Sequence, residues 1–184
     1  QFEIETTSSN VESQSQDTDK TLDPVQEFKI GDRGPAGGFV FYDKGSYSDG
    51  WRYLEIAPEE TEFPFMPWGP GGVIVGETSA GVGAGYENTK RIVSGLGNAN
   101  TKTGKPYPAL LCDQLVHQGH DDWFLPSKDE LALAYQNLMV PQKGDFPIEK
   151  NLVNPYWSST EDESTGFGAF AYNLYGHNGS FSNS

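Results

Sequence analysis

Residues 121–138 read Asp-Asp-Trp-Phe-Leu-Pro-Ser-Lys-Asp-Glu-Leu-Ala-Leu-Ala-Tyr-Gln-Asn-Leu, a short apolar run followed by a helical pattern. The apolar residues 123–125 predict a short strand, and Pro126 ends it. Ser127 is followed three residues later by Glu130, which is the pattern of a capping box at a helix N-terminus. The stretch therefore predicts a strand-to-helix corner.

The helix after this corner carries an apolar stripe, because Leu131, Tyr135 and Leu138 recur at i, i+4 and i+7. Other parts of the chain have to cover that stripe. Lys128 and Asp129 fall in the first turn, where we expect them to face water. Core packing and helix capping explain the whole stretch without a functional role.

The composition limits the class of protein. A chain of 184 residues can form one domain with a real core. Its 26 acidic and 12 basic residues give a net charge of -14, which disfavours nucleic acid as a partner and leaves a calcium site open. No apolar run approaches the ~20 residues of a transmembrane helix. A start at Gln1 fits removal of a signal peptide or lipoprotein leader, although an arbitrary boundary would look the same.

Cys112 is the single cysteine, so the chain has no internal disulfide and no two-cysteine redox or metal chemistry. It lies in an expected helix over residues 108–117, where we expect a small buried thiol.

Residues 1–28 differ in composition from the rest and predict an extended, disordered arm or tether. Phe2, Ile4 and Thr6 alternate with glutamates, a period-2 pattern that can pair as a strand where a sheet edge is offered.

The remaining segments predict a mixture of strands and helices. Glycines and a proline in residues 31–38 predict a tight turn leading into a strand over 39–42, which forms a hairpin with a strand over 50–58. No Lys-Ser or Lys-Thr pair follows the glycines, which argues against a phosphate-binding loop. Further along, we expect a long aromatic-containing loop over 59–86, a helix over 88–96 with Asn88 as a cap, and C-terminal strands over 154–160 and 166–175 separated by a polar turn over 161–165.

The order of these motifs resembles the Lcl C-terminal domain family, named for the C-terminal domain of the Legionella collagen-like adhesin. The resemblance rests on Gly-Asp-Arg-Gly-Pro-Ala-Gly-Gly-Phe-Val-Phe-Tyr at 31–42, Gly-Trp-Arg-Tyr-Leu-Glu-Ile-Ala-Pro at 50–58, Asn-Thr at 88–89, Trp-Phe-Leu-Pro-Ser-Lys-Asp-Glu-Leu at 123–131 and Tyr-Trp-Ser-Ser-Thr-Glu at 156–161. It covers about residues 29–184 and implies an α+β, C-type lectin-like fold, similar to formylglycine-generating enzymes, with a small mixed sheet, two main helices and long loops.

The same resemblance implies a setting on secreted or surface proteins of bacteria and their phages, where relatives bind glycans or host matrix, or present diversified loops. One departure is that family members continue past the turn corresponding to Asn178–Ser184 into a final strand, and this chain stops there. An unpaired sheet edge invites another strand. The arm from Phe2 to Thr6 is one candidate to fill it, in this chain or a neighbour. An incomplete chain end is the alternative.

Catalytic chemistry has few candidates in the sequence. His117, His120 and His177, with Asp121 and Asp122, are the residues from which an iron or zinc site would have to be built, but Gly119 interrupts the first pair. The oxidase chemistry of the formylglycine-generating relatives needs a cysteine pair, which this chain lacks. Ser158 and Ser159 have no histidine placed by sequence to activate them. We therefore expect no enzyme activity and no cofactor, with calcium left open.

Ligand binding makes better use of the C-terminal residues. Carboxylates and amides can hydrogen-bond sugar hydroxyls or coordinate calcium, and an aromatic ring can stack on a sugar. The candidate ligand-binding residues are Glu161, Asp162, Asn173, Tyr175, His177 and Asn178, with residues 85–88 adding to the same surface. An ordinary hydrated turn is the alternative for each of them, and Trp157 is expected in the core.

Two functional hypotheses follow. The first is an extracellular, adhesin-like, non-catalytic recognition domain that binds a glycan or protein ligand through its C-terminal loops. The second is a structural subunit of a surface assembly or filament, a homo-oligomer whose neighbours are held by the N-terminal arm, with Phe2 and Ile4 as its apolar contacts.

Overall fold

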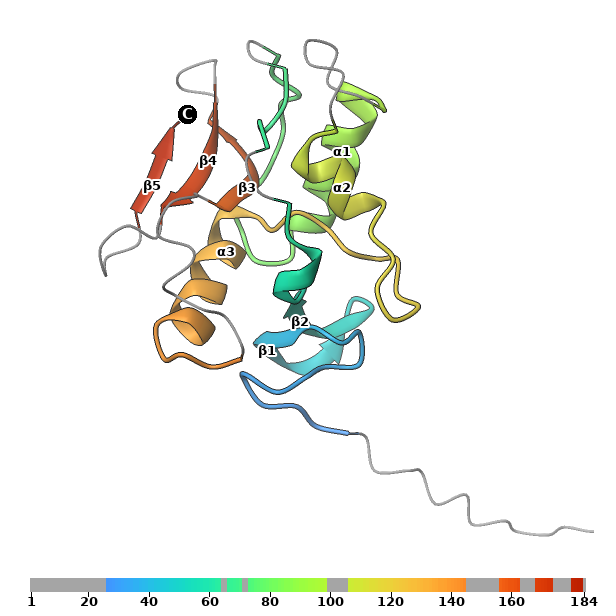
Figure 1. Cartoon of the computed structure of the whole chain (residues 1–184), viewed down its shortest axis with the longest axis vertical. Coiled ribbons are helices and arrows are strands. Elements are labelled where there is room, and N and C mark those ends of the chain that lie inside the picture. The colour runs from blue at the N-terminus through green and yellow to red at the C-terminus, as the bar shows by residue number, and fades with distance from the viewer. Residues whose placement is uncertain are drawn as a thin grey trace, which may run out of the picture.

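The computed structural model describes residues 26–63, 66–70, 73–98, 106–144, 156–162, 168–173 and 180–183, and these form a mixed α and β structure. Figure 1 shows a hairpin of two strands at one end of the molecule and two helices toward the other. A third helix lies beside a second, three-stranded sheet. The mixed α and β prediction is confirmed. Residues 1–25 of the predicted arm, including Phe2 and Ile4, lie outside the described residues.

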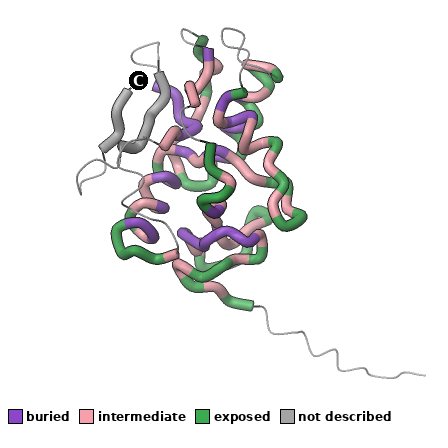
Figure 2. The backbone as a smooth tube through the Cα atoms, viewed as in Figure 1, coloured by how far each residue is buried: buried purple, intermediate pink, exposed green. Residues whose placement is uncertain are grey.

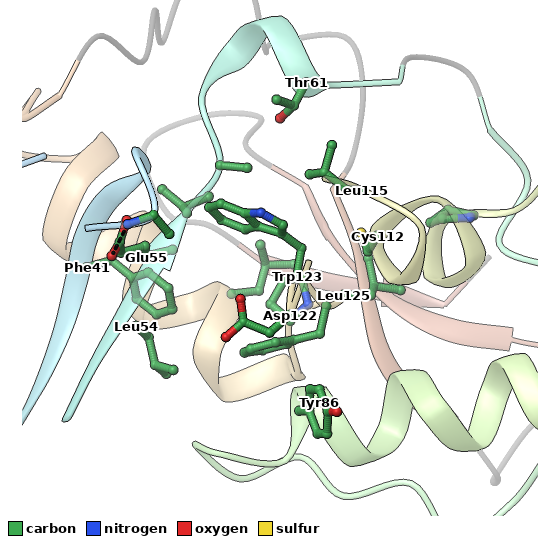
Figure 3. Close-up of a pocket in the computed structure, with 18 of the residues that line it drawn as sticks. Phe41, Leu54, Glu55, Thr61, Tyr86, Cys112, Leu115, Asp122, Trp123 and Leu125 are labelled. Carbon is green, nitrogen blue, oxygen red and sulfur yellow. Dashed lines mark hydrogen bonds between the residues drawn. The ribbon is translucent and has the colours of Figure 1, made fainter. Parts of the chain in front are cut away.

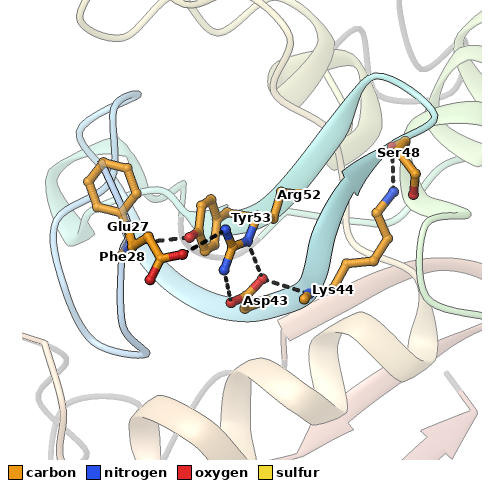
Figure 4. Close-up of polar contacts among 8 residues, drawn as sticks. Glu27, Phe28, Asp43, Lys44, Ser48, Arg52 and Tyr53 are labelled. Carbon is orange, nitrogen blue, oxygen red and sulfur yellow. Dashed lines mark hydrogen bonds and ion pairs between the residues drawn. The ribbon is translucent and has the colours of Figure 1, made fainter. Parts of the chain in front are cut away.

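The predicted N-terminal hairpin is confirmed. Strand β1 (Phe39–Ser48) pairs antiparallel with β2 (Trp51–Ile56), and Asp49 and Gly50 make the turn at positive φ. Arg52 donates from Nε and Nη2 to the two carboxylate oxygens of Asp43 at 2.9 and 3.1 Å, a bidentate pair across the strands. Figure 4 shows this pair, together with Glu27, which accepts from the same guanidinium.

The capping box is also confirmed. Helix α3 (Lys128–Ala134) begins after Ser127, whose hydroxyl accepts from the Glu130 backbone N–H while the Glu130 carboxylate accepts from the Ser127 N–H. The helix continues as a π-helical turn, η2 (Tyr135–Met139). Leu131 and Leu138 are buried, as the apolar stripe predicts.

The strand predicted at residues 123–125 is wrong, because the chain is extended there without forming a ladder. The backbone N–H of Leu125 donates to the Thr89 hydroxyl at 3.0 Å, and the Leu125 carbonyl accepts from that hydroxyl. A side chain of the first helix thus takes the hydrogen bonds that a neighbouring strand would make.

The two remaining helices differ from prediction at their ends. Helix α1 (Gly85–Leu96) begins before Asn88, which is therefore no cap: its buried amide bonds to Ser79 and Ser159. Helix α2 (Pro108–Asp113) stops short of residue 117, and a tight turn follows at residues 117–120. A short 3₁₀ helix, η1 (Glu59–Thr61), lies in the long loop.

The C-terminal sheet has the order β3-β4-β5 and is antiparallel, with β3 (Tyr156–Asp162), β4 (Gly168–Asn173) and β5 (Ser180–Asn183). The predicted polar turn is wrong at its start, since Glu161 and Asp162 lie in β3 and are buried. The turn predicted over 178–184 is wrong as well, since β5 pairs with β4 within it.

The core consists of two apolar clusters, and their buried segments are purple in Figure 2. One joins the hairpin to α3 through Phe39, Phe41, Leu54, Leu131 and Leu138. The other joins α1, α2 and the 121–127 segment through residues such as Ile92, Tyr107 and Leu125. Within the described residues, no helix has the length and apolar character needed to cross a bilayer.

Three glutamates hold glycine-containing loops in place by accepting hydrogen bonds from their backbone N–H groups. Glu55 accepts from Ala36 and Gly38, Glu130 from Gly83, Gly85 and Ser127, and Glu161 from Val75 and Gly76, at 2.6 to 3.4 Å. Hydrogen bonds to an ionised acceptor are stronger than neutral ones. Part of the acidic composition is therefore structural.

Candidate functional site

A cavity of about 990 Å³ lies between the N-terminal hairpin and the helical end of the molecule. Its walls come from β1, β2, the segment around η1, the start of α1, α2, residues 122–126, α3 and the start of β3. Exposed side chains such as Phe63 and Tyr86 stand in its walls, so the cavity opens to solvent. Its volume suits a small ligand or a side-chain-sized group.

Aromatic rings dominate these walls. Strand β2 contributes Trp51 and Tyr53 to the lining, and the extended segment after Asp122 adds Trp123 and Phe124. Figure 3 shows Trp123 between the hairpin and α2. The full aromatic set is Phe41, Trp51, Tyr53, Phe63, Tyr86, Trp123, Phe124, Tyr156 and Trp157. Such faces can stack on a ring or attract a cation.

The polar side chains of the lining are mostly acidic. Five carboxylates contribute to it, namely Asp49, Glu55, Glu62, Glu87 and Asp122. In the described lining there is no lysine, arginine, histidine, asparagine, glutamine or serine. The cavity therefore offers negative charge and hydrogen-bond acceptors.

Burial changes the acidity of two of these carboxylates. Desolvation raises the pKa of Glu55, against the N–H groups of Ala36 and Gly38, which favour its ionised form. Desolvation also raises the pKa of Glu62, which accepts a 2.6 Å hydrogen bond from the Tyr156 hydroxyl. Both carboxylates already have partners in the protein.

Asp122 is different. The residue is exposed, and no hydrogen bond or ion pair from the described residues reaches its carboxylate. Figure 3 shows the carboxylate inside the cavity, on the side facing Leu54 and Glu55. It is a negative charge beside aromatic rings with no partner in the described part of the chain.

Three of the side-chain donors in the lining are already used. Thr61 donates to the Pro58 carbonyl at 2.7 Å, Tyr156 to Glu62, and the Trp157 indole to the Met66 carbonyl at 2.8 Å. The Trp123 indole nitrogen is buried and has no hydrogen-bond partner. The same holds for Nε2 of His117, whose ring contacts the Trp123 ring. These are the two buried side-chain nitrogens without a partner among the described residues. Among the described residues, the Trp51 and Trp123 indoles and the Tyr53 and Tyr86 hydroxyls donate to no protein group, so the free donors are fewer than the carboxylate acceptors.

The structure brings together few of the residues predicted to bind a ligand. Glu161 and Asp162 are only 6% and 5% exposed, and the Glu161 carboxylate is occupied by the backbone at residues 75–76, so the expected open carboxylate turn is wrong for both. Asn173 is placed in β4 by its backbone. Tyr175, His177 and Asn178 lie outside the described residues.

Residues 85–88 divide between two roles. Tyr86 and Glu87 line the cavity, whereas Asn88 is buried in the network around Ser79. Trp157, expected in the core, packs against the second apolar cluster and also lines the cavity. Sequence reasoning missed this cavity, although Asp-Asp-Trp-Phe at 121–124 and Trp-Arg-Tyr at 51–53 place acids and aromatic rings together in a way that signals it.

Cys112, Ser158 and Ser159 are three of the residues considered for catalysis, and the structure describes all three. Burial raises the pKa of the Cys112 thiol to about 12, so it is protonated at neutral pH. Ser158 and Ser159 are buried, with backbone, Thr160 and Asn88 as their hydrogen-bond partners. Within the described residues, no group of three or more histidine, cysteine or acidic side chains is placed to hold a metal, and a calcium site elsewhere stays a prediction.

No protein-family model, no curated protein and no solved structure matches this chain. The site has to be interpreted from its own chemistry.

Proposed function

We propose that this chain is a non-catalytic recognition domain, extracellular or at a cell surface, that binds a glycan or protein ligand by admitting part of it into the aromatic cavity. The observation that carries the proposal is a cavity of about 990 Å³ walled by aromatic rings and acceptors. Concave, largely apolar sites with a few polar groups are where proteins bind ligands.

The proposal moves the predicted site from the C-terminal loops to the hairpin side of the molecule. A tryptophan or tyrosine face can stack on the apolar face of a sugar, and a carboxylate can accept from its hydroxyls. A C-type lectin-like fold and an adhesin-like role are part of the proposal, supported by the motif order that resembles the Lcl C-terminal domain family and by the mixed α and β architecture.

A pair of adjacent residues tests this site. Leu115 lines the cavity, whereas its neighbour Val116 is 67% exposed and does not. We expect Leu115→Trp to fill the cavity and abolish specific signal on glycan and peptide arrays, and Val116→Trp to leave that signal intact. Loss of signal after changes at Tyr175 and His177, but not after Leu115→Trp, would return the site to the C-terminal loops.

A structural subunit is the second candidate, favoured by the two-stranded hairpin. Beyond Val40, β1 forms a strand ladder with β2 alone among the described residues, and of its other edge the Phe41 carbonyl is already occupied by the Asn137 amide. An added strand would have to pair with the part of that edge beyond Phe41. Removing residues 1–25 keeps the contacts of Glu27 and Phe28 with the hairpin. A mass that falls from oligomer to monomer on this deletion, measured by light scattering, supports assembly through the arm, and an unchanged monomer rules it out.

A further inference from the structure

Resting on the proposed function, we propose further that the group admitted to the cavity is an organic cation, an ammonium group, primary or methylated, carried on an apolar body. The site would then select its ligand by charge as well as shape.

The charge of the lining points to a cation. Five carboxylates line the cavity and no cationic side chain does so in the part of the chain that the structure describes. A carboxylate or phosphate ligand would meet like charge in a partly desolvated site, with no arginine or lysine to pair with it. Anionic ligands are therefore disfavoured.

The aromatic rings point the same way, because two rings of this cavity already hold cations that are not themselves part of the lining. Lys44 lies 3.8 Å from the centroid of the Trp51 ring and Arg52 lies 4.8 Å from that of Tyr53. These cations have their own counter-charges, since Lys44 lies 3.7 Å from Asp49 and Arg52 pairs with Asp43. Asp49 is thereby paired, and the other four carboxylates of the lining, Glu55, Glu62, Glu87 and Asp122, have no ion pair among the described residues.

The hydrogen-bond inventory separates a cation from a neutral sugar. Thr61, Tyr156 and Trp157 use their donors on other parts of the protein, which leaves the donors of Trp51, Tyr53, Tyr86 and Trp123 against the oxygens of five carboxylates. A polyhydroxylated ligand needs donors as well as acceptors, and a site that leaves its polar groups unpaired loses affinity. An ammonium group needs only acceptors and aromatic faces.

Asp122 supplies the counter-charge. Its carboxylate has no partner among the described residues and stands in the lining next to Trp123 and Phe124. No lysine or arginine of the described chain lies over either of those two rings. An ammonium group there would meet a carboxylate and two aromatic rings at once.

Three probes of nearly the same shape test the charge. Choline, its neutral isostere 3,3-dimethylbutan-1-ol and the anion 3,3-dimethylbutanoate are titrated into the full chain and followed by NMR. The salt is about 0.15 M, where the Debye length is about 8 Å and the general attraction of a -14 protein is screened. We expect choline to bind about tenfold or more tightly than the alcohol, and the anion not to bind.

Two adjacent aspartates provide matched variants. Asp122→Asn removes the carboxylate in the lining, and Asp121→Asn removes the same charge from an exposed neighbour outside it. We expect Asp122→Asn to weaken choline binding by about three- to tenfold and Asp121→Asn to leave it within twofold.

Equal binding of choline and the alcohol overturns the cation inference and leaves the recognition function standing. Equal losses in both aspartate variants overturn it as well, because the attraction would then be general. If none of the three probes binds, the inference fails, while the proposed function is decided separately by the arrays with Leu115→Trp.

Discussion

Glu130 and Asp122 lie in the same stretch of sequence, yet the structure treats the two carboxylates in opposite ways. Glu130 is fully buried and accepts hydrogen bonds from the backbone of Gly83, Gly85 and Ser127. Asp122 is exposed at the cavity and, in the described part of the chain, accepts none. A buried carboxylate with all its partners holds a fold together, whereas one left without partners beside aromatic rings is available to a ligand.

The difference follows from the cost of desolvation. Removing a carboxylate from water costs several kcal/mol unless the protein replaces the lost hydrogen bonds. The glycines at 83 and 85 make that replacement possible, since a Cβ at Gly85 would lie 2.3 Å from the Glu130 carboxylate. Asp122 is exposed, so water can still hydrogen-bond its carboxylate and the protein does not have to supply donors.

The largest expected effect is at Glu130. We expect Glu130→Ala to lower the free energy of unfolding by about 3 to 4 kcal/mol, because three backbone donors lose their acceptor. Asp129→Ala, an exposed change in the same helical turn, should cost less than about 1 kcal/mol. Urea unfolding followed by tryptophan fluorescence measures both, and similar losses in the two variants would remove the structural role assigned to Glu130.

A second test concerns the loop held by Glu55. A Cβ at Gly38 would lie 2.6 Å from the Ile56 carbonyl oxygen, a backbone atom that cannot rotate away. We expect Gly38→Ala to cost about 2 to 3 kcal/mol in urea unfolding. Gly81→Ala is the matched control, because its Cβ would have only the Ser79 hydroxyl near it, at 3.9 Å, and should cost less than about 1 kcal/mol. An equal loss at Gly81 would mean that close approach is not the cause.

Local patterns predicted the elements whose partners are near in sequence. Ser127 and Glu130 cap their own helix, and Leu131 and Leu138 share one helix face. The hairpin was predicted as well, although its first strand runs on to Ser48 and only residues 49–50 form the turn. In each case the deciding interaction lies within a few residues, or a simple period carries the signal.

Burial of polar residues by distant segments was not predictable in the same way. The local sequence predicts Glu161 as a turn residue, but its carboxylate accepts hydrogen bonds from the N–H groups of residues 75–76. The local sequence likewise predicts Asn88 as a helix cap, but its side chain bonds to Ser79 and Ser159. The cavity was not predictable from local patterns either, because its walls come from segments spread from Ala36 to Trp157. Tertiary partners, which no local pattern encodes, decide all three.

Stability against pH tests whether Glu55 behaves as a buried acid. Desolvation raises its pKa above 4.5, with His120 and Asp122 as the charged groups nearby. The folded protein then binds more protons than the unfolded chain, so the free energy of unfolding falls as the pH rises from 4.5 through the folded pKa. Relative to the wild type, Glu55→Gln should therefore gain stability as the pH rises above 4.5 and through the folded pKa of Glu55.

The control for that experiment is Glu60→Gln, which removes the same charge from an exposed residue in η1. Subtracting its pH profile removes the effect of net charge. A Glu55→Gln profile that runs parallel to the Glu60→Gln profile would show that burial does not set the acidity of Glu55.

The smallest expected effect is at Asp122, and it bears most directly on the contrast with Glu130. Since its carboxylate has no partner among the described residues, we expect Asp122→Asn to change the free energy of unfolding by less than about 0.5 kcal/mol. The sign should favour the variant slightly, because one negative charge leaves a chain of net charge -14. Urea unfolding at low ionic strength measures it. A loss above about 1 kcal/mol would mean that Asp122 supports the fold as Glu130 does. Weaker ligand binding in that variant would then report on folding, so the stability measurement has to come before the choline titration is interpreted.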